Sequence, residues 1–112
     1  MENIWYDGSV RILGSNIVSD YLTSHASDRR TNAARSSYSA WEAITLAAVW
    51  NVPQDVKISH PKASILKSSR VVFNVKGNDY RLVCLVNYQA RLVVIRWFGS
   101  HSEYDKIDAE TI

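Results

Sequence analysis

Three apolar runs in the second half of the chain restrict the possible folds more than any other feature. They are RVVFNV (residues 70–75), YRLVCLVNY (80–88) and RLVVIRWF (91–98). All three are rich in β-branched and aromatic residues, and the turn-forming stretches KGND and YQAR separate them. Strands joined by such short turns pair in antiparallel fashion. The sequence therefore predicts three consecutive antiparallel strands.

Pairing the strands through these turns predicts a register. It places Val75 opposite Tyr80, Phe73 opposite Leu82, Cys84 opposite Ile95 and Leu82 opposite Trp97. Because side chains alternate between the two faces of a sheet, one face is then almost wholly apolar and suits packing against helices. The opposite face, here called the arginine face, is predicted to carry Arg70, Val72, Asn74, Arg81, Val83, Leu85, Asn87, Val94, Arg96 and Phe98.

The first half of the chain predicts a short strand and two helices. VRIL (residues 10–13) is the strand candidate, and Ser15 can cap the first helix. Thr31 or Asn32 can cap the second helix, which Pro53 is predicted to stop. The apolar stripe of the second helix is predicted to contain Trp41, Ile44, Leu46, Ala48, Val49 and Trp50. The expected fold is α+β, with a small, mainly antiparallel sheet of about four strands in β-α-α-β-β-β order and a short C-terminal helix.

Length and composition indicate one domain over residues 1–112. The chain is 46% apolar and 21% charged, close to the averages of soluble globular proteins. The single cysteine, Cys84, can form neither an internal disulfide nor a multi-cysteine metal site. No stretch of about 18 residues is apolar throughout, and the start MENIWYDGSV lacks the segments of a secretion leader. We therefore expect a cytoplasmic protein that does not associate with membranes.

Basic residues are concentrated in the strand region. Between Lys57 and Trp97 there are eight lysines and arginines and a single acid, Asp79, whereas acids predominate in the last ten residues. The arginine face contains no acid, so its guanidinium groups lack partners across the sheet. Arginine holds phosphate oxygens through paired hydrogen bonds, which favours a nucleic acid as the partner of this face. The alternative is ordinary solvated surface charge.

The segment that follows the last strand, SHSEYDK (residues 100–106), allows two interpretations. Its first residue and the glutamate three positions later match a capping box, which would simply begin a short helix. In a helical turn, however, His101 shares one side with Tyr104 and Asp105. The carboxylate could orient the imidazole for proton transfer. Both interpretations remain open from the sequence.

RNA cleavage requires groups of this kind. A base takes the proton of the 2′-hydroxyl, cations stabilise the charge on the phosphoryl oxygens, and an acid protonates the departing 5′-oxygen. His101 and Tyr104 suit the proton transfers, and Arg81 and Arg96 suit the charge. No group of residues has metal-ligand spacing, so neither a metal nor a cofactor is expected.

Parts of the chain resemble a known family. VVFNVKGNDYRLV (residues 71–83) and GSHSEYDKIDAETI (99–112) are similar to HigB-type toxins, which are RelE-like mRNA interferases of type II toxin–antitoxin pairs. With WEAITLAAVWNVPQDVK the resemblance covers roughly residues 41–112, and the spacing between the blocks also fits. MENIWYDGS, residues 1–9, looks like an extension before the first strand.

The resemblance implies an α/β fold of β-α-α-β-β-β order and an endoribonuclease that cuts translated mRNA, commonly at the ribosome. It also implies a HigA-type antitoxin with a helix-turn-helix domain, through which alone the toxin would reach operator DNA. RelE-like enzymes vary in their active-site residues, so the site is assigned from geometry. The candidates are Arg81, Arg96, His101 and Tyr104 for catalysis, Asp105 for orientation, and Lys67, Arg70, Asn74 and Phe98 for RNA binding. The non-enzymatic alternative is an RNA- or ribosome-binding module whose arginines only dock on the polyanion.

Overall fold

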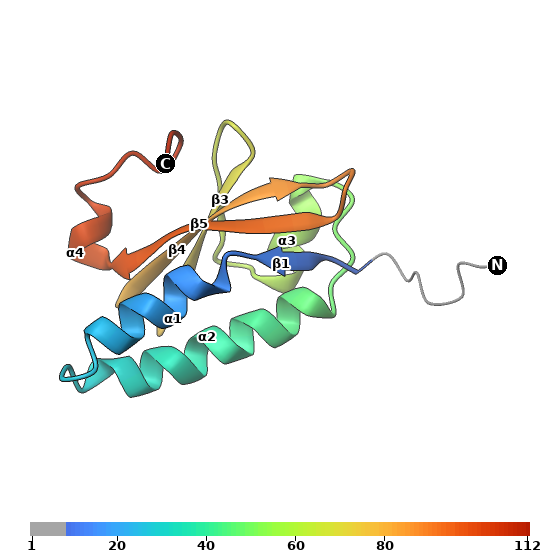
Figure 1. Ribbon diagram of the computed structural model, residues 1–112. Coiled ribbons are helices and arrows are strands. Elements are labelled where there is room, and N and C mark those ends of the chain that lie inside the picture. The colour runs from blue at the N-terminus through green and yellow to red at the C-terminus, as the bar shows by residue number, and fades with distance from the viewer. Residues whose placement is uncertain (1–8) are drawn as a thin grey trace.

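A mixed sheet of five strands forms the centre of the molecule in a computed structural model that describes residues 9–112 (Figure 1). In the order in which they lie in the sheet, the strands are β1 (Arg11–Leu13), β5 (Leu92–Ser100), β4 (Tyr80–Asn87), β3 (Arg70–Val75) and β2 (Ser64–Ile65). β1 pairs with β5 in parallel, and all the other neighbours are antiparallel. The predicted extension over residues 1–9 lies, apart from Ser9, outside the described residues.

Four helices accompany the sheet: α1 (Ser15–Ser24), α2 (Arg30–Leu46), α3 (Pro53–Ser59) and α4 (His101–Tyr104). α1 and α2 lie side by side on one face of the sheet, and α4 follows the end of β5 (Figure 1). None of the helices in residues 9–112 has the length and apolar character needed to cross a membrane. The predicted α+β class and the order of its main elements are confirmed, while β2 and α3 are additions to it.

Local sequence explains where the helices begin. Gly14, and not the predicted Ser15, is the N-terminal cap of α1. This position requires glycine, because its φ is 88° and a Cβ there would lie 2.7 Å from the carbonyl oxygen of Ile95. α2 starts at Arg30, before the predicted caps. The prediction that Pro53 stops the second helix was wrong, because α2 already ends at Leu46. Pro53 instead begins α3, since proline suits the first helical turn.

The helix-covered face of the sheet carries the main core. Trp41, Trp50 and Phe73 are at most 4% exposed, and their rings pack with centroid distances of 5.2 and 6.2 Å from that of Phe73. The predicted stripe of α2 is only partly right, because the helix ends at Leu46 and the chain then turns. Ile44, Leu46 and Val49 are each nearly half exposed. The buried face of α2 instead contains Thr31, Ala34, Tyr38, Trp41 and Thr45.

One extra residue in β5 changes the predicted register. The pairs Val75–Tyr80, Phe73–Leu82 and Cys84–Ile95 are confirmed. Leu82, however, pairs with Phe98 and Val83 with Trp97, because a β-bulge at Arg96 puts two residues of β5 against one of β4. Trp97 and Phe98 therefore exchange faces, so the prediction for both was wrong. Phe98 is 4% exposed within the helix-covered core.

The opposite face is partly covered by the C-terminal segment, so the arginine face is smaller than the sequence predicts. Ala109 packs on Val72 and Val83, which are both buried. Leu66, Trp97, Tyr104, Ile107 and Ile112 pack around them. This second, smaller core fixes the chain that follows α4 against the sheet.

Candidate functional site

The capping box predicted at the start of α4 is present. The Oγ of Ser100 accepts a hydrogen bond from the backbone N–H of Glu103 at 3.2 Å, and the Glu103 Oε1 accepts one from the N–H of Ser100 at 2.8 Å. Gly99 allows this joint to close, because a Cβ there would lie 2.5 Å from the Trp97 ring and 2.9 Å from Glu103 Oε1. The short helix is thus held firmly at the end of β5.

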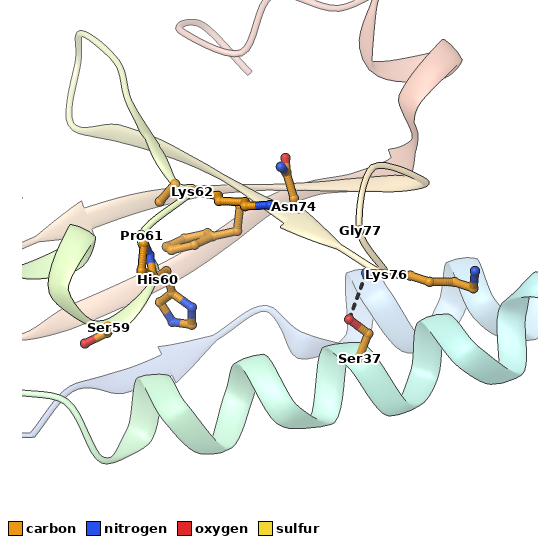
Figure 2. A pocket seen from close by; sticks show the side chains of 10 residues that line it. Ser37, Ser59, His60, Pro61, Lys62, Asn74, Lys76 and Gly77 are labelled. Atoms are coloured by element: carbon orange, nitrogen blue, oxygen red, sulfur yellow. Dashed lines mark hydrogen bonds between the residues drawn. The ribbon is translucent and has the colours of Figure 1, made fainter.

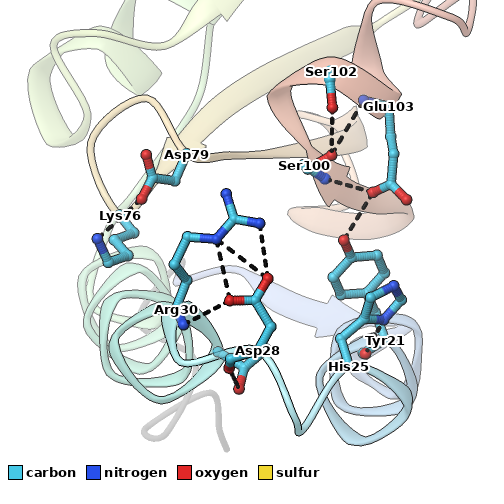
Figure 3. A network of polar contacts seen from close by, with 10 residues as sticks. Tyr21, His25, Asp28, Arg30, Lys76, Asp79, Ser100, Ser102 and Glu103 are labelled. Carbon is cyan, nitrogen blue, oxygen red and sulfur yellow. Dashed lines mark hydrogen bonds and ion pairs between the residues drawn. The ribbon is translucent and has the colours of Figure 1, made fainter.

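The same glutamate fastens α4 to α1 (Figure 3). Tyr21 donates its hydroxyl to Glu103 Oε1 at 2.8 Å, and the imidazole of His25 stacks on the Tyr21 ring at 3.9 Å. Burial, together with the neighbouring carboxylate, raises the pKa of the Tyr21 phenol, so it remains a proton donor. The hydrogen bonds from Ser100 and Tyr21 lower the pKa of Glu103. These contacts join residues about eighty positions apart, a distance that sequence patterns do not reveal.

Glu103 should make the stability of the fold depend on pH. Its folded pKa lies below the usual value of 4.5, so its contribution is complete above that value and is lost as the pH falls through the lowered pKa. We expect Glu103→Gln to lower the free energy of unfolding by about 1 kcal/mol at pH 7. The difference from wild type should shrink towards zero in acid, as urea denaturation over a pH series will measure. A difference that is constant with pH would contradict this.

His101 and Asp105 form the predicted i, i+4 pair. The His101 Nε2 lies 3.8 Å from Asp105 Oδ1, and both side chains are more than half exposed. The backbone N–H of His101 donates to the carbonyl of Asp79 at 2.9 Å, which ties the helix to the β3–β4 turn. The backbone of His101 is therefore fixed while its imidazole ring remains accessible, as a proton-transfer group requires.

His101 and Asp105 line an open cleft of about 420 Å³. The other lining residues come from the start of α2, the β3–β4 turn and α4: Arg30, Asn78, Asp79, Ser100 and Ser102. Arg30 is the cation that sequence analysis missed, because the polar stretch before α2 gave no sign that it would face α4. Its guanidinium forms an ion pair with the Asp28 carboxylate at 2.8 Å, and this contact lowers the pKa of Asp28 to about 2 (Figure 3).

Tyr104 faces the other way from this cleft. Its ring centroid lies 6.1 Å from that of Trp97, and the Arg81 guanidinium lies 6.0 Å from the centre of the ring. Arg81 donates to the carbonyls of Asn78 and Tyr80 at 3.0 and 3.2 Å, so it is oriented by the backbone and not by an acid. His101 and Tyr104 thus lie on one turn but line two adjoining surfaces.

Arg96 projects from the bulge of β5 and is exposed. Within residues 9–112, neither Arg81 nor Arg96 takes part in an ion pair with a carboxylate. The β-bulge shifts Arg96 out of the regular strand pairing. Arg81 and Arg96 are therefore not aligned across β4 and β5 as the predicted register requires. Both remain able to bind an anion.

The four RNA-binding candidates have different surroundings. Asn74 is exposed and pairs with Arg81 across the strands. The backbone of Lys67 donates to Glu110 at 3.4 Å, while the Arg70 guanidinium donates to the carbonyl of Ile112 at 2.6 Å. Arg70 therefore holds the C-terminal segment. Phe98 is buried, as described above, so it cannot stack on a base, and we correct that assignment.

In the described part of the chain no three histidine, cysteine or acidic side chains are grouped as metal ligands. Cys84 is completely buried, and burial raises the pKa of its thiol, so it stays protonated and unreactive. The groups that can act are therefore an accessible imidazole paired with a carboxylate, a phenol, and three guanidinium groups on neighbouring surfaces. Together they can hold a phosphodiester and move protons at it.

Comparison with known proteins identifies the family of the chain. A family model described as HigB_toxin, RelE-like toxic component of a toxin-antitoxin system, matches residues 34–107. No curated protein sequence matches the chain. The match includes α2 from Ala34 onward, α3, β2 to β5 and all of α4, and so spans most of the fold and nearly all the residues of the two surfaces. The chain belongs to the HigB toxin family and is the toxic component of a toxin–antitoxin system.

Proposed function

We propose that this toxin is an endoribonuclease that cleaves mRNA. The observation that carries the proposal is the His101–Asp105 pair, 3.8 Å apart, exposed in a cleft that also contains a guanidinium group. A toxin needs a target whose loss stops growth, and the basic strand region suits a polyanion. Membership of a RelE-like toxin family adds support. The RelE-like toxins that the sequence resembles are mRNA interferases.

In the proposed reaction a base removes the proton of the 2′-hydroxyl, and the freed oxygen forms a bond to the adjacent phosphorus. The bond from phosphorus to the 5′-oxygen breaks, and an acid delivers a proton to that oxygen. The products are a 2′,3′-cyclic phosphate and a 5′-hydroxyl end. His101 and Tyr104 are the candidates for proton transfer, and Asp105 orients His101. Arg81 and Arg96 stabilise the phosphoryl charge.

Arg30 is a second cation near the proposed path of the RNA, although Asp28 already pairs with it at 2.8 Å. It lies in the cleft with His101, while Arg81 lies beside Tyr104 on the adjoining surface. An RNA strand that passes over α4 would meet both. We propose that translated mRNA in the cytoplasm is the substrate and that the ribosome presents it. We further propose that the antitoxin is of the HigA type, with a helix-turn-helix domain, and that it alone contacts operator DNA.

The test is to map RNA 5′ ends in cells after brief induction of the wild type and of a His101→Ala/Tyr104→Phe double variant. New 5′ ends within reading frames for the wild type alone would support a nuclease with its chemistry at α4. Equal cleavage by both proteins would keep the nuclease and move the chemistry to the arginines. Growth arrest without new ends would leave a module that binds RNA or the ribosome, for which the uncompensated Arg81 and Arg96 would suffice. Circular dichroism must show that the double variant is folded.

A further inference from the structure

A groove of about 380 Å³ runs along the outer edge of β3, away from the α4 site (Figure 2). Ser37 of α2 lines one side of it and the loop at His60 and Pro61 the other (Figure 2). Phe73, which is 1% exposed, also lines it. The remaining lining residues are Ser59, Lys62, Ala63, Asn74, Lys76 and Gly77. None of the residues proposed for catalysis lies in it.

Beyond the end of β2, the backbone of β3 is unpaired on this side at Asn74. β2 pairs only with Val71 and Val72. The Leu66 N–H donates to the carbonyl of Arg70 at 2.9 Å, so Arg70 turns its backbone groups outward, and alternate residues of an antiparallel strand do the same. By this alternation the N–H and C=O of Asn74 also point outward, beyond the end of β2. Among the described residues nothing continues the sheet beside them.

Two contacts keep this edge open. The chain before β2 turns away, since the N–H of Ala63 donates to the carbonyl of His60 at 3.0 Å. On the other side, the next outward N–H of the strand line, that of Lys76, is already bound to the Oγ of Ser37 at 2.8 Å (Figure 2). Ser37 of α2 thus closes one end of the edge, and the groove at Asn74 lies between Ser37 and the His60–Ala63 loop.

The chemistry of the groove indicates what would fit. Its lining contains two lysines and no acid. The Lys76 ammonium is already paired with Asp79 at 2.9 Å, so Lys62 is the cation that favours a negatively charged segment. Its floor is apolar, because Phe73 and Ala63 lie there with the ring of His60. Burial lowers the pKa of that imidazole, which keeps it neutral near pH 7. An extended peptide matches an edge of this kind, since its backbone pairs with the strand and alternate side chains enter the groove.

Since the chain is the toxic component of a toxin–antitoxin system, it has an antitoxin as a protein partner. We infer that an extended, acidic segment of the antitoxin adds a strand to the free edge of β3 and pairs with the backbone of Asn74. This goes beyond the proposed nuclease function and does not depend on it. It requires only the family membership, the open edge and the basic groove.

The first test compares two substitutions at one position. Asn74→Pro removes the outward N–H and blocks pairing, while it leaves the hydrogen bonds to β4 intact because this N–H does not point there. Asn74→Ala removes only the side chain. With the full-length cognate antitoxin, calorimetry should give a dissociation constant that is about tenfold or more higher for Asn74→Pro, and close to wild type for Asn74→Ala. Equal affinities for all three proteins would overturn the inference.

Hydrogen exchange on the wild-type toxin, free and in complex, tests the same point without a substitution. The Asn74 amide should exchange fast in the free toxin and slowly in the complex. Protection in the free toxin that depends on its concentration would instead identify a second copy of the chain as the occupant. An unprotected amide in the complex would place the antitoxin elsewhere. Charge is tested by Lys62→Glu, which should weaken binding, against Lys106→Glu on the far side of the fold, which should not.

Discussion

Replacing His101 by alanine is expected to slow mRNA cleavage by about 10²- to 10⁴-fold, the usual contribution of a positioned acid or base. The reason is that His101 is exposed in the cleft and its Nε2 lies 3.8 Å from the Asp105 carboxylate. The side chain belongs to neither core. Its removal should therefore affect the chemistry and not the fold. The measurement is the single-turnover rate on a defined message in a cell-free translation reaction, with the toxin in excess.

Lys106→Ala is the matched control, because Lys106 is exposed, lies five positions further on and is absent from the cleft. It should cleave at nearly the wild-type rate. Asp105→Asn should fall between the two, since it keeps the shape of the side chain but loses the charge that orients the imidazole. If His101→Ala cleaves as fast as Lys106→Ala, then His101 is not a catalytic residue and Arg81 becomes the first position to change.

Replacing Phe73 by alanine is expected to lower the free energy of unfolding by about 3–5 kcal/mol, as is usual for a buried aromatic ring. Phe73 is 1% exposed, and its ring lies 5.2 Å from Trp41, 6.2 Å from Trp50 and 5.0 Å from His60, measured between centroids. The variant would lose the ring contacts with Trp41, Trp50 and His60 that join α2 and the loops around α3 to the sheet. Urea denaturation followed by tryptophan fluorescence will measure the change.

The control for this experiment is Ile58→Ala. Ile58 lies on α3, close in sequence to the same core, but it is 79% exposed. Its replacement should change the stability by less than about 0.5 kcal/mol. A comparable loss for both variants would show that the ring cluster is not the centre of the fold. The Phe73 variant alone should also lose cooperativity in its unfolding transition.

The strands could be predicted well because their signals are local. Alternation and short turns determined the pairing of β3 with β4, and the register of Val75 with Tyr80 follows from the turn between them. The β-bulge at Arg96 could not be predicted, since it depends on how β5 fits both β1 and β4. Its consequence was large, because one extra residue sends Phe98 into the core and Trp97 to the opposite face.

In the candidate site, too, the features that depend on local spacing could be predicted and those that depend on tertiary packing could not. The partners of the His101–Asp105 pair and of the capping box of Ser100 with Glu103 are at most four positions apart, so their spacing alone predicted them. Arg30 and Tyr21 reach the site only through the packing of α1 and α2 on the sheet. No periodic pattern records such a contact. The C-terminal segment over the arginine face escaped prediction for the same reason, since nothing local links Ala109 to Val83.

The position of β5 in the sheet has a consequence for the cell that makes this protein. β5 lies between β1 and β4, so the first strand of the chain obtains its partner only when the last strand has been synthesised. Until then a growing chain on the ribosome has β2, β3 and β4 as one piece of sheet and β1 as an unpaired strand, and His101 and Tyr104 have not yet been added. On the proposed assignment of the chemistry to His101 and Tyr104, cleavage can begin only when translation of the chain is nearly complete. The ribosome that makes the protein would then meet no active site for almost the whole of that time.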